Sequence, residues 1–284
     1  YDNTTRGKFF RKRSIELVRK DLLYLRDIMN VEYVYFWADT FFAWSNKQFD
    51  EFCEMYEDFK LPFWCQTRVE TVTHERIKKL KNIGLHMLAF GMEHGNEKFR
   101  ADVIDRKYSN ESAIKALQIP HQYGVPFTVN NIIGFPGETR ELSFDTIEIN
   151  RNWEADQMSC SILQPYYGTP LRKVVVENEY LHPDAICPAN SDDTMLDLPN
   201  YSAEEMKGLR RTFAMYVKFP KNRWKDIEKA EKIDSEVDKV WEDLKQEYLD
   251  RYLVTSDTDI TEQGNPKDVE DSQGGMGPST SFSI

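Results

Sequence analysis

The regular alternation of predicted strands and helices constrains the fold of this 284-residue chain more than any other feature. Five short runs are rich in β-branched and aromatic residues, which favours strands: residues 31–37, 63–69, 85–92, 125–134 and 157–164. Each run is followed by a stretch with apolar residues at helical spacing, and one such helix, residues 14–29, precedes the first run. Ser14 and Thr73 are predicted to cap helices, Gly84 to end the second of these, and Ser202 to open a helix with a capping box. Residues 110–123 are predicted to form one helix after a polar loop. This alternation is typical of parallel strands joined by right-handed crossovers. We therefore predict an α/β fold, a partial barrel whose first strand lies upstream of the leading helix.

Polar or glycine-containing sequence follows every predicted strand. These strand ends are Asp39, Arg68, Glu93, Asn131 with Gly134, and Gln164 with Pro165. The carboxyl ends of the strands build the active site in parallel barrels, so these residues are the candidates for a ligand site.

The stretch V-P-F-T-V-N-N-I-I-G-F-P-G-E at residues 125–138 carries the most specific signal. A strand here breaks into a turn and then feeds a helix. Gly134 and Gly137 suit a turn that needs unusual φ angles or a close approach of backbone to a ligand, and Pro136 stiffens it.

The composition excludes several functional classes. Hydrophobic content of 40% and charged content of 30% are those of a globular protein, and no apolar run is long enough to span a membrane. The net charge of −11 argues against general affinity for nucleic acid. The four cysteines are scattered and form no Cys-x-x-Cys pair, which predicts buried, reduced thiols in a cytoplasmic protein.

Three regions are expected along the chain. Residues 1–180 contain the strand–helix alternation, residues 181–253 are predicted to be mainly helical, and residues 254–284 have the composition of a disordered tail. The chain opens at Tyr1 without an initiator methionine, and we expect it to be the downstream part of a longer protein.

Several candidate residues have both a structural and a functional interpretation. Asp39 either caps the following helix or is a carboxylate at the barrel mouth. Arg68 and Glu93 either pair with each other or bind a carboxylate and ribose hydroxyls. His94 is either a base or, more simply, the partner in a structural hydrogen bond. Tyr166 and Tyr167 either cover a substrate or pack in the core. No nucleophile–base motif or phosphate loop is present, so a cofactor is expected to supply the chemistry.

Taken in order, these strand ends resemble the radical S-adenosylmethionine (SAM) superfamily, and in particular the group associated with an N-terminal cobalamin-binding domain. The resemblance covers about residues 1–176. It rests on these stretches: R-G-K-F-F-R-K-R-S at 6–14, Y-F-W-A-D-T-F at 35–41, L-A-F-G-M-E at 88–93, N-I-I-G-F-P-G-E at 131–138, and residues 165–170.

The resemblance implies a partial (β/α)6 barrel, like a TIM barrel, with a C-terminal helical extension. It implies a [4Fe-4S] cluster held by three cysteines, SAM bound at the open iron, and in some members cobalamin bound by an upstream domain. Reductive cleavage of SAM then leads to radical-based modification or to methyl transfer. The implied partners are a reductant such as flavodoxin or ferredoxin and a small-molecule, lipid or peptide substrate.

The resemblance also implies roles for individual residues. Asp39 lies near the methionine amino group of SAM, Arg68 meets the carboxylate, and Glu93 meets the ribose hydroxyls. The stretch that begins at Asn131 contributes backbone from Ile133, Gly134 and Gly137 to the adenine and methionine moieties. Pro165 and the residues after it support the adenine.

The sequence departs from the family in one decisive respect, because the Cys-x3-Cys-x2-Cys motif is absent. We expect the motif to lie upstream of Tyr1, so that this polypeptide alone does not bind the cluster and is inactive. Three alternatives remain open at this point: a tRNA-modifying radical SAM methylthiotransferase, a non-catalytic barrel scaffold, and an unrelated barrel lyase or aldolase.

Overall fold

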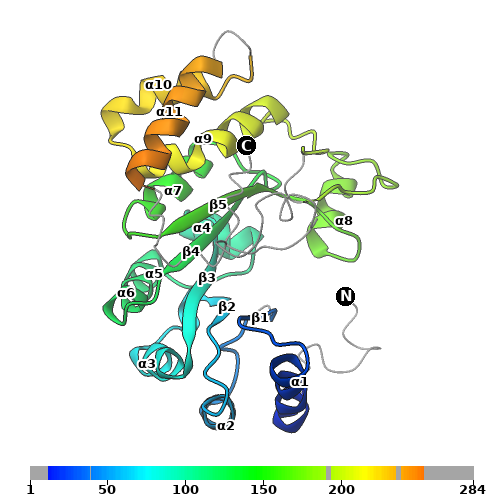
Figure 1. The fold of residues 1–284 in the computed structure, drawn as a ribbon. Helices are drawn as coiled ribbons and strands as arrows, with labels where there is room; N and C mark the ends of the chain where they lie inside the picture. Colours follow the sequence, from blue (N-terminus) through cyan, green and yellow to red (C-terminus); the bar gives the residue numbers. More distant parts are fainter. Residues whose placement is uncertain (1–11, 39, 190–192, 235–237, 253–284) are drawn as a thin grey trace.

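The computed structural model describes residues 12–38, 40–189, 193–234 and 238–252. Its centre is one sheet of five parallel strands in the order β1-β2-β3-β4-β5 (Figure 1). The strands are β1 (Val34–Phe36), β2 (Phe63–Arg68), β3 (Leu85–Glu93), β4 (Phe127–Ile133) and β5 (Gln157–Ile162). Sequential order of parallel neighbours is the topology of a partial barrel, and the predicted α/β fold class is confirmed.

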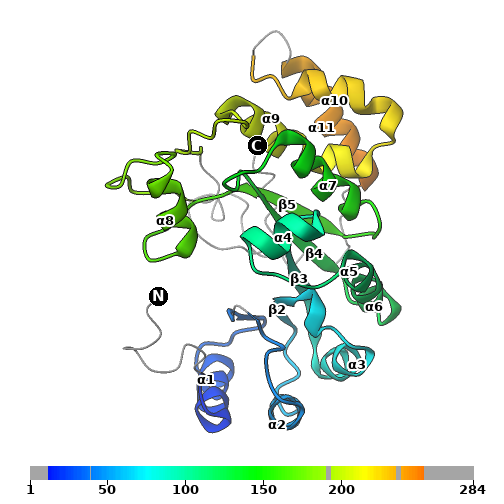
Figure 2. The same cartoon turned by 180° about the vertical axis from the view of Figure 1, so that it is seen from behind.

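The helices that connect the strands pack on one face of this sheet (Figure 2). They are α1 (Ile15–Asp27), α2 (Asn46–Tyr56), α3 (His74–Ile83), α4 (Glu97–Val103), α5 (Asn110–Leu117), α6 (Ile119–Gln122) and α7 (Arg140–Asn150), with a 3-10 turn η1 (Val69–Thr71) after β2. Every second residue of β4 is buried on this face, starting from Phe127, which is the alternation expected of a strand covered on one side by helices.

Local sequence signals explain where most helices begin and end. The side chain of Ser14 caps α1, Thr73 caps α3, and Gly84 ends α3 in the left-handed region with φ 118°. The capping box predicted at Ser202 is also present, with Glu205 as its partner. These four predictions are confirmed.

Two predictions from the sequence were wrong in detail. The segment between Glu93 and Asn110 contains the helix α4 and is not only a polar loop. Asn96 caps α4, but its seven residues are too few to show a clear helical period in the sequence. The helix predicted over residues 110–123 is split into α5 and α6, because Pro120 has no backbone N–H to donate.

The remaining helices are α8 (Pro170–Glu177), α9 (Ala203–Lys218), η2 (Lys221–Arg223), α10 (Trp224–Ala230) and α11 (Asp238–Tyr252). Of these, α9 to α11 form a second layer beside β5 and α7, and α8 lies apart from them. Helices α9 to α11 share a hydrophobic core with β5 and α7 that includes Met206, Phe213 and Trp241, as the upper part of Figure 1 shows. No helix in the described part of the chain is long and apolar enough to cross a membrane. The tail predicted at residues 254–284 lies outside the described residues.

Candidate functional site

The carboxyl ends of β2 and β3 meet at one edge of the sheet and bring two predicted site residues together. Arg68 ends β2 and is in register with Gly91 of β3, while Glu93 ends β3 opposite Asn131 of β4. The register shifts by one residue between Gly91 and Glu93, so that β3 is bulged at this end. Bulges next to active sites are a common means of re-aiming a side chain.

Glu93 adopts a left-handed backbone conformation with φ 66°, which is strained for a residue with a Cβ atom. Two buried groups hold the carbonyls on either side of it. The hydroxyl of Tyr108 donates to the carbonyl of Met92 at 2.8 Å, and the guanidinium of Arg100 donates to the carbonyl of His94 at 2.7 Å. The surrounding structure thus fixes the backbone of Glu93, as expected where strain serves a site.

The carboxylate of Glu93 lies over Gly91. A Cβ atom at position 91 would stand only 2.3 Å from Glu93 Oε1, so the glycine leaves the space that the carboxylate occupies. Arg106 Nη2 pairs with the same oxygen at 3.0 Å. Burial raises the pKa of Glu93, and the positive charges of Arg106 and Arg68 oppose that rise.

The charges around Glu93 leave two guanidinium nitrogens without an acceptor. Arg68 pairs with Glu70 and not with Glu93, so of the two interpretations of these residues, the one in which they pair with each other is wrong. Arg68 Nε and Arg106 Nη1 are both buried and have no hydrogen-bond partner within the described chain. Unsatisfied buried donors are costly, so each of these nitrogens is available to an anionic acceptor.

Arg106 is a site residue that the sequence analysis did not single out. It lies thirteen positions after Glu93, in the loop between α4 and α5, and its backbone N–H is bonded to the carbonyl of Arg100. The available signal was a basic residue in the loop that directly follows a candidate strand end. That signal did not identify Arg106, because its contact with Glu93 depends on how α4 folds back and brings the following loop to the end of β3.

The turn after β4 has the geometry predicted from its glycines. Gly134 and Gly137 have φ angles of 83° and 81°, in the region that favours glycine. The N–H of Leu163 donates to the carbonyl of Ile133 at 2.8 Å and ties the turn to the end of β5. The side chain of Ile133 is fully buried in the core, so only its backbone is available to a ligand.

Asn131 is turned away from the strand ends. Asn150 of α7 donates to its side-chain oxygen at 2.8 Å, and its own amide donates to the carbonyl of Ser159 at 3.1 Å. Its side chain is 1% exposed and joins β4 to α7 and β5. At position 131, therefore, only backbone atoms are available for the contact with SAM that the resemblance implies for residues 131–138.

Pro165 lies three residues beyond β5 and is buried, and the exposed residues 166–168 follow it. Its carbonyl accepts from Arg172 Nη1 at 3.2 Å, and the guanidinium of Arg172 stands 3.5 Å from the ring centre of Tyr167. Tyr166 and Tyr167 are 47% and 61% exposed, so the interpretation that they pack in the core is wrong.

Asp39 lies outside the described residues, whereas the structural interpretation of His94 is confirmed. His94 is fully buried, and its ring nitrogens bond to Glu138 and to the backbone N–H of Asn96.

The cysteines do not offer a site for an iron–sulfur cluster. All four are free thiols; Cys53, Cys65 and Cys160 are buried, Cys187 is partly buried, and burial raises the pKa of Cys65 and of Cys160. Among the described residues, no three histidine, cysteine or acidic side chains are grouped so as to bind a metal ion. The residues present therefore do not fit a [4Fe-4S] cluster, which needs thiolate ligands.

Comparison with known proteins shows the family to which the chain belongs. The sequence profile of the radical SAM superfamily matches residues 2–147, just over half of the chain. An uncharacterized methyltransferase, PH0819, of Pyrococcus horikoshii is 26% identical over 223 residues, which cover 78% of this chain and 48% of that protein. A tRNA-2-methylthio-N(6)-dimethylallyladenosine synthase of Halalkalibacterium halodurans is 34% identical over 88 residues, which cover 29% of this chain and 16% of that protein. The chain spans about half the length of the first of these relatives and less of the second.

A solved structure with a similar fold is that of the cobalamin-dependent S-adenosylmethionine radical enzyme OxsB with aqua-cobalamin and S-adenosylmethionine bound. The two are 13% identical, with a TM-score of 0.54, and the match covers 87% of this chain and 48% of that one. At this identity the likeness concerns the fold alone.

Proposed function

Because the chain belongs to the radical SAM superfamily, we propose that the carboxyl ends of β2, β3 and β4 bind S-adenosylmethionine. The observation that carries the proposal is the convergence of Arg68, Glu93 and Arg106 beside Gly91, with two buried guanidinium nitrogens lacking an acceptor. A carboxylate satisfies such nitrogens, and a ribose diol suits the carboxylate of Glu93.

Each part of SAM has a matching group in this arrangement. Arg68 Nε and Arg106 Nη1 donate to the methionine carboxylate, and Glu93 accepts from the ribose hydroxyls. The backbone from Ile133 to Gly137 packs on the adenine and methionine moieties, and Pro165 supports the adenine from the end of β5. Asp39 is assigned to the methionine amino group.

For the whole protein we assign reductive cleavage of SAM, leading to radical-based modification or to methyl transfer, with methyl transfer supported by the name of the relative PH0819. In this superfamily a [4Fe-4S] cluster supplies the electron. The four cysteines of this chain do not fit that cluster. The role proposed for this chain is therefore to bind and orient SAM, and no step through the cluster is assigned to its residues.

Binding of SAM to the 284-residue chain tests this proposal. We expect titration calorimetry to show binding, and Glu93→Gln to weaken it by about tenfold to a hundredfold, because hydrogen bonds to a charged group contribute about 1.5–3 kcal/mol. Glu111→Gln is the matched control, since Glu111 is 78% exposed and pairs with Lys115 on the same helix. A native chain that does not bind SAM would favour the scaffold interpretation instead.

The affinity for SAM is also expected to depend on pH through Glu93. Burial raises the pKa of this residue above the ordinary value of 4.5, and protonation removes both its charge and its pairing with Arg106. As the pH falls, we expect affinity to drop before an ordinary exposed glutamate is protonated. Titrations between pH 8 and pH 4 measure this dependence, and Glu93→Gln should flatten it. An identical pH profile in both proteins would contradict the assignment.

A further inference from the structure

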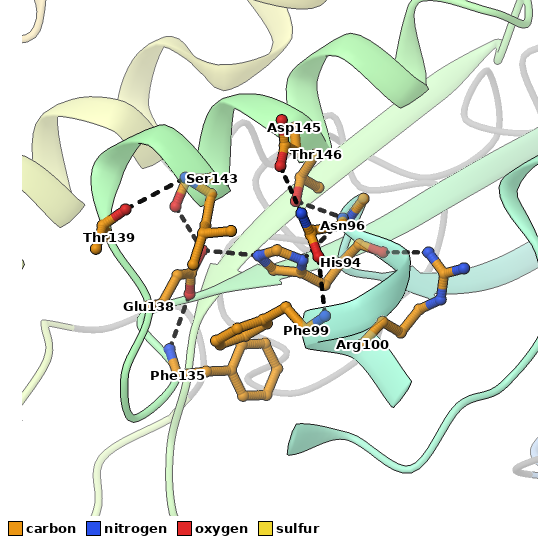
Figure 3. A network of polar contacts seen from close by, with 12 residues as sticks. His94, Asn96, Phe99, Arg100, Phe135, Glu138, Thr139, Ser143, Asp145 and Thr146 are labelled. Carbon is orange, nitrogen blue, oxygen red and sulfur yellow. Dashed lines mark hydrogen bonds and ion pairs between the residues drawn. The ribbon is translucent and has the colours of Figure 1, made fainter. Parts of the chain in front are cut away.

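A chain of buried polar groups connects the glycine turn after β4 with the C-terminal helical layer. Its centre is Glu138, which directly follows the turn and is 1% exposed (Figure 3). The carboxylate of Glu138 accepts from the backbone N–H of Phe135 at 2.9 Å and from Ser143 Oγ at 2.5 Å. Glu138 thus joins the two ends of the turn by a hydrogen bond and connects the turn to α7.

The same carboxylate is bonded to His94, the residue that follows Glu93 at the end of β3. His94 Nδ1 accepts from the backbone N–H of Asn96 at 3.1 Å, so the neutral ring carries its hydrogen on Nε2. His94 Nε2 then donates to Glu138 at 3.2 Å, as the centre of Figure 3 shows. The residue next to Glu93 is therefore bonded to the residue next to Gly137, and the two strand ends are held as one unit.

Tyr201 completes this chain from a distant part of the sequence. Its hydroxyl lies 3.1 Å from Ser143 Oγ, and the whole residue is 1% exposed. Ser143 has a single hydroxyl hydrogen, and an ionised carboxylate can only accept. Ser143 therefore donates to Glu138, and Tyr201 donates to Ser143.

A second contact from the same segment reaches the turn independently. Tyr201 immediately precedes Ser202, the cap of α9, and Met206 lies in the first turns of that helix. A Cβ atom at Gly134 would stand 2.7 Å from Met206 Sδ. The start of α9 thus contacts the turn at Gly134 by packing and at Glu138 through Ser143.

We propose that Tyr201 is a positioning residue for the SAM site. Through Tyr201, the C-terminal helical layer holds the glycine turn and the end of β3 at Glu93 in their binding geometry. The inference rests on the function proposed above and extends it to a residue that contacts neither strand end. Its hydroxyl orients Ser143, Ser143 orients the carboxylate of Glu138, and Glu138 fixes Phe135 and His94. Removing that hydroxyl leaves every direct contact to SAM in place but loosens the turn.

Hydrogen exchange and SAM titration of the 284-residue chain together test the inference. We expect Tyr201→Phe to speed exchange of the backbone amides of Phe135, Gly137 and Glu138, the residues of 135–138 that carry an N–H, by about tenfold. The central amides of β2 and α3 should keep their native rates, so that a general loss of stability is distinguished from local loosening. The same variant should weaken SAM binding about fivefold to tenfold, because part of the binding energy is used to order the turn.

Tyr56→Phe is the matched control. Tyr56 is also fully buried and donates one hydrogen bond, to the carbonyl of Leu61 at 3.1 Å, but it lies in the core between α2 and β2. This variant should leave exchange at residues 135–138 and SAM affinity at native values.

The outcomes separate this inference from the function on which it rests. If the native chain binds SAM and Tyr201→Phe changes neither turn exchange nor affinity, the positioning role is overturned while the proposed function stands. If turn exchange rises but affinity is native, the role is also overturned, because the network then serves stability alone. If the native chain does not bind SAM, the proposed function fails and this inference fails with it.

Discussion

Replacing Arg100 by methionine is expected to lower the free energy of unfolding by about 3 kcal/mol, because three acceptors, buried or partly buried, lose their donor. Arg100 is fully buried, and its guanidinium donates to the carbonyls of His94 and Tyr108 and to Asn110 Oδ1 at 2.6–2.9 Å. Burial lowers the pKa of Arg100, and relief of this desolvation offsets part of the loss. Urea denaturation with an unchanged m-value measures the effect.

The matched control for this variant is on the same helix. Lys98 of α4 has a side chain that is 86% exposed and pairs with Asp102 on the same helix, so Lys98→Met should change stability by less than about 0.5 kcal/mol. If Arg100→Met proved as mild as the control, the carbonyl of His94, next to Glu93, would not depend on the guanidinium. The clamp on the strained backbone of Glu93 would then need another explanation.

The second large effect is expected at the glycine turn. Gly134→Ala should cost about 2–4 kcal/mol, the sum of a left-handed conformation for an alanine and the crowding of its Cβ. The neighbours are Met206 Sδ at 2.7 Å and Ile162 Cγ2 at 3.1 Å. Met206 and Ile162 are both buried, so neither can move aside freely. Thermal or urea unfolding of the purified variant measures the loss.

Gly137 provides a control that differs in one respect only. Its φ of 81° matches the 83° of Gly134, but a Cβ atom there would have no neighbour within 4 Å. Gly137→Ala should therefore cost about 1 kcal/mol, the conformational part alone. In a Met206→Ala background, Gly134→Ala should cost less than in the native background, because only the contact with Ile162 Cγ2 at 3.1 Å then remains. Equal losses for the two alanine variants in the native background would show that packing of α9 on the turn contributes nothing.

Local sequence determined the elements and several of their ends. The strand–helix alternation, the caps at Ser14 and Thr73 and the left-handed φ angles at Gly134 and Gly137 all follow from interactions within a few residues. Backbone sterics and side-chain periodicity act at that range, so a single sequence is enough to predict them. The order of the parallel strands also followed, because short right-handed crossovers leave few alternatives.

Only the tertiary structure decided which side chains meet. The one-residue register shift between Gly91 and Glu93 is an example, because in a strand a shift of one residue moves a side chain to the opposite face. At this shift Glu93 lies opposite Asn131 of β4. The side chain of Asn131 is bonded to α7, whereas the carboxylate of Glu93 pairs with Arg106.

The contact of Tyr201 with Ser143 joins residues 58 positions apart. No pattern within a helix or strand predicts such a contact, because it depends on how whole layers pack and on which buried groups remain to be satisfied. Periodicity therefore determined the framework of this protein, and long-range packing determined its site.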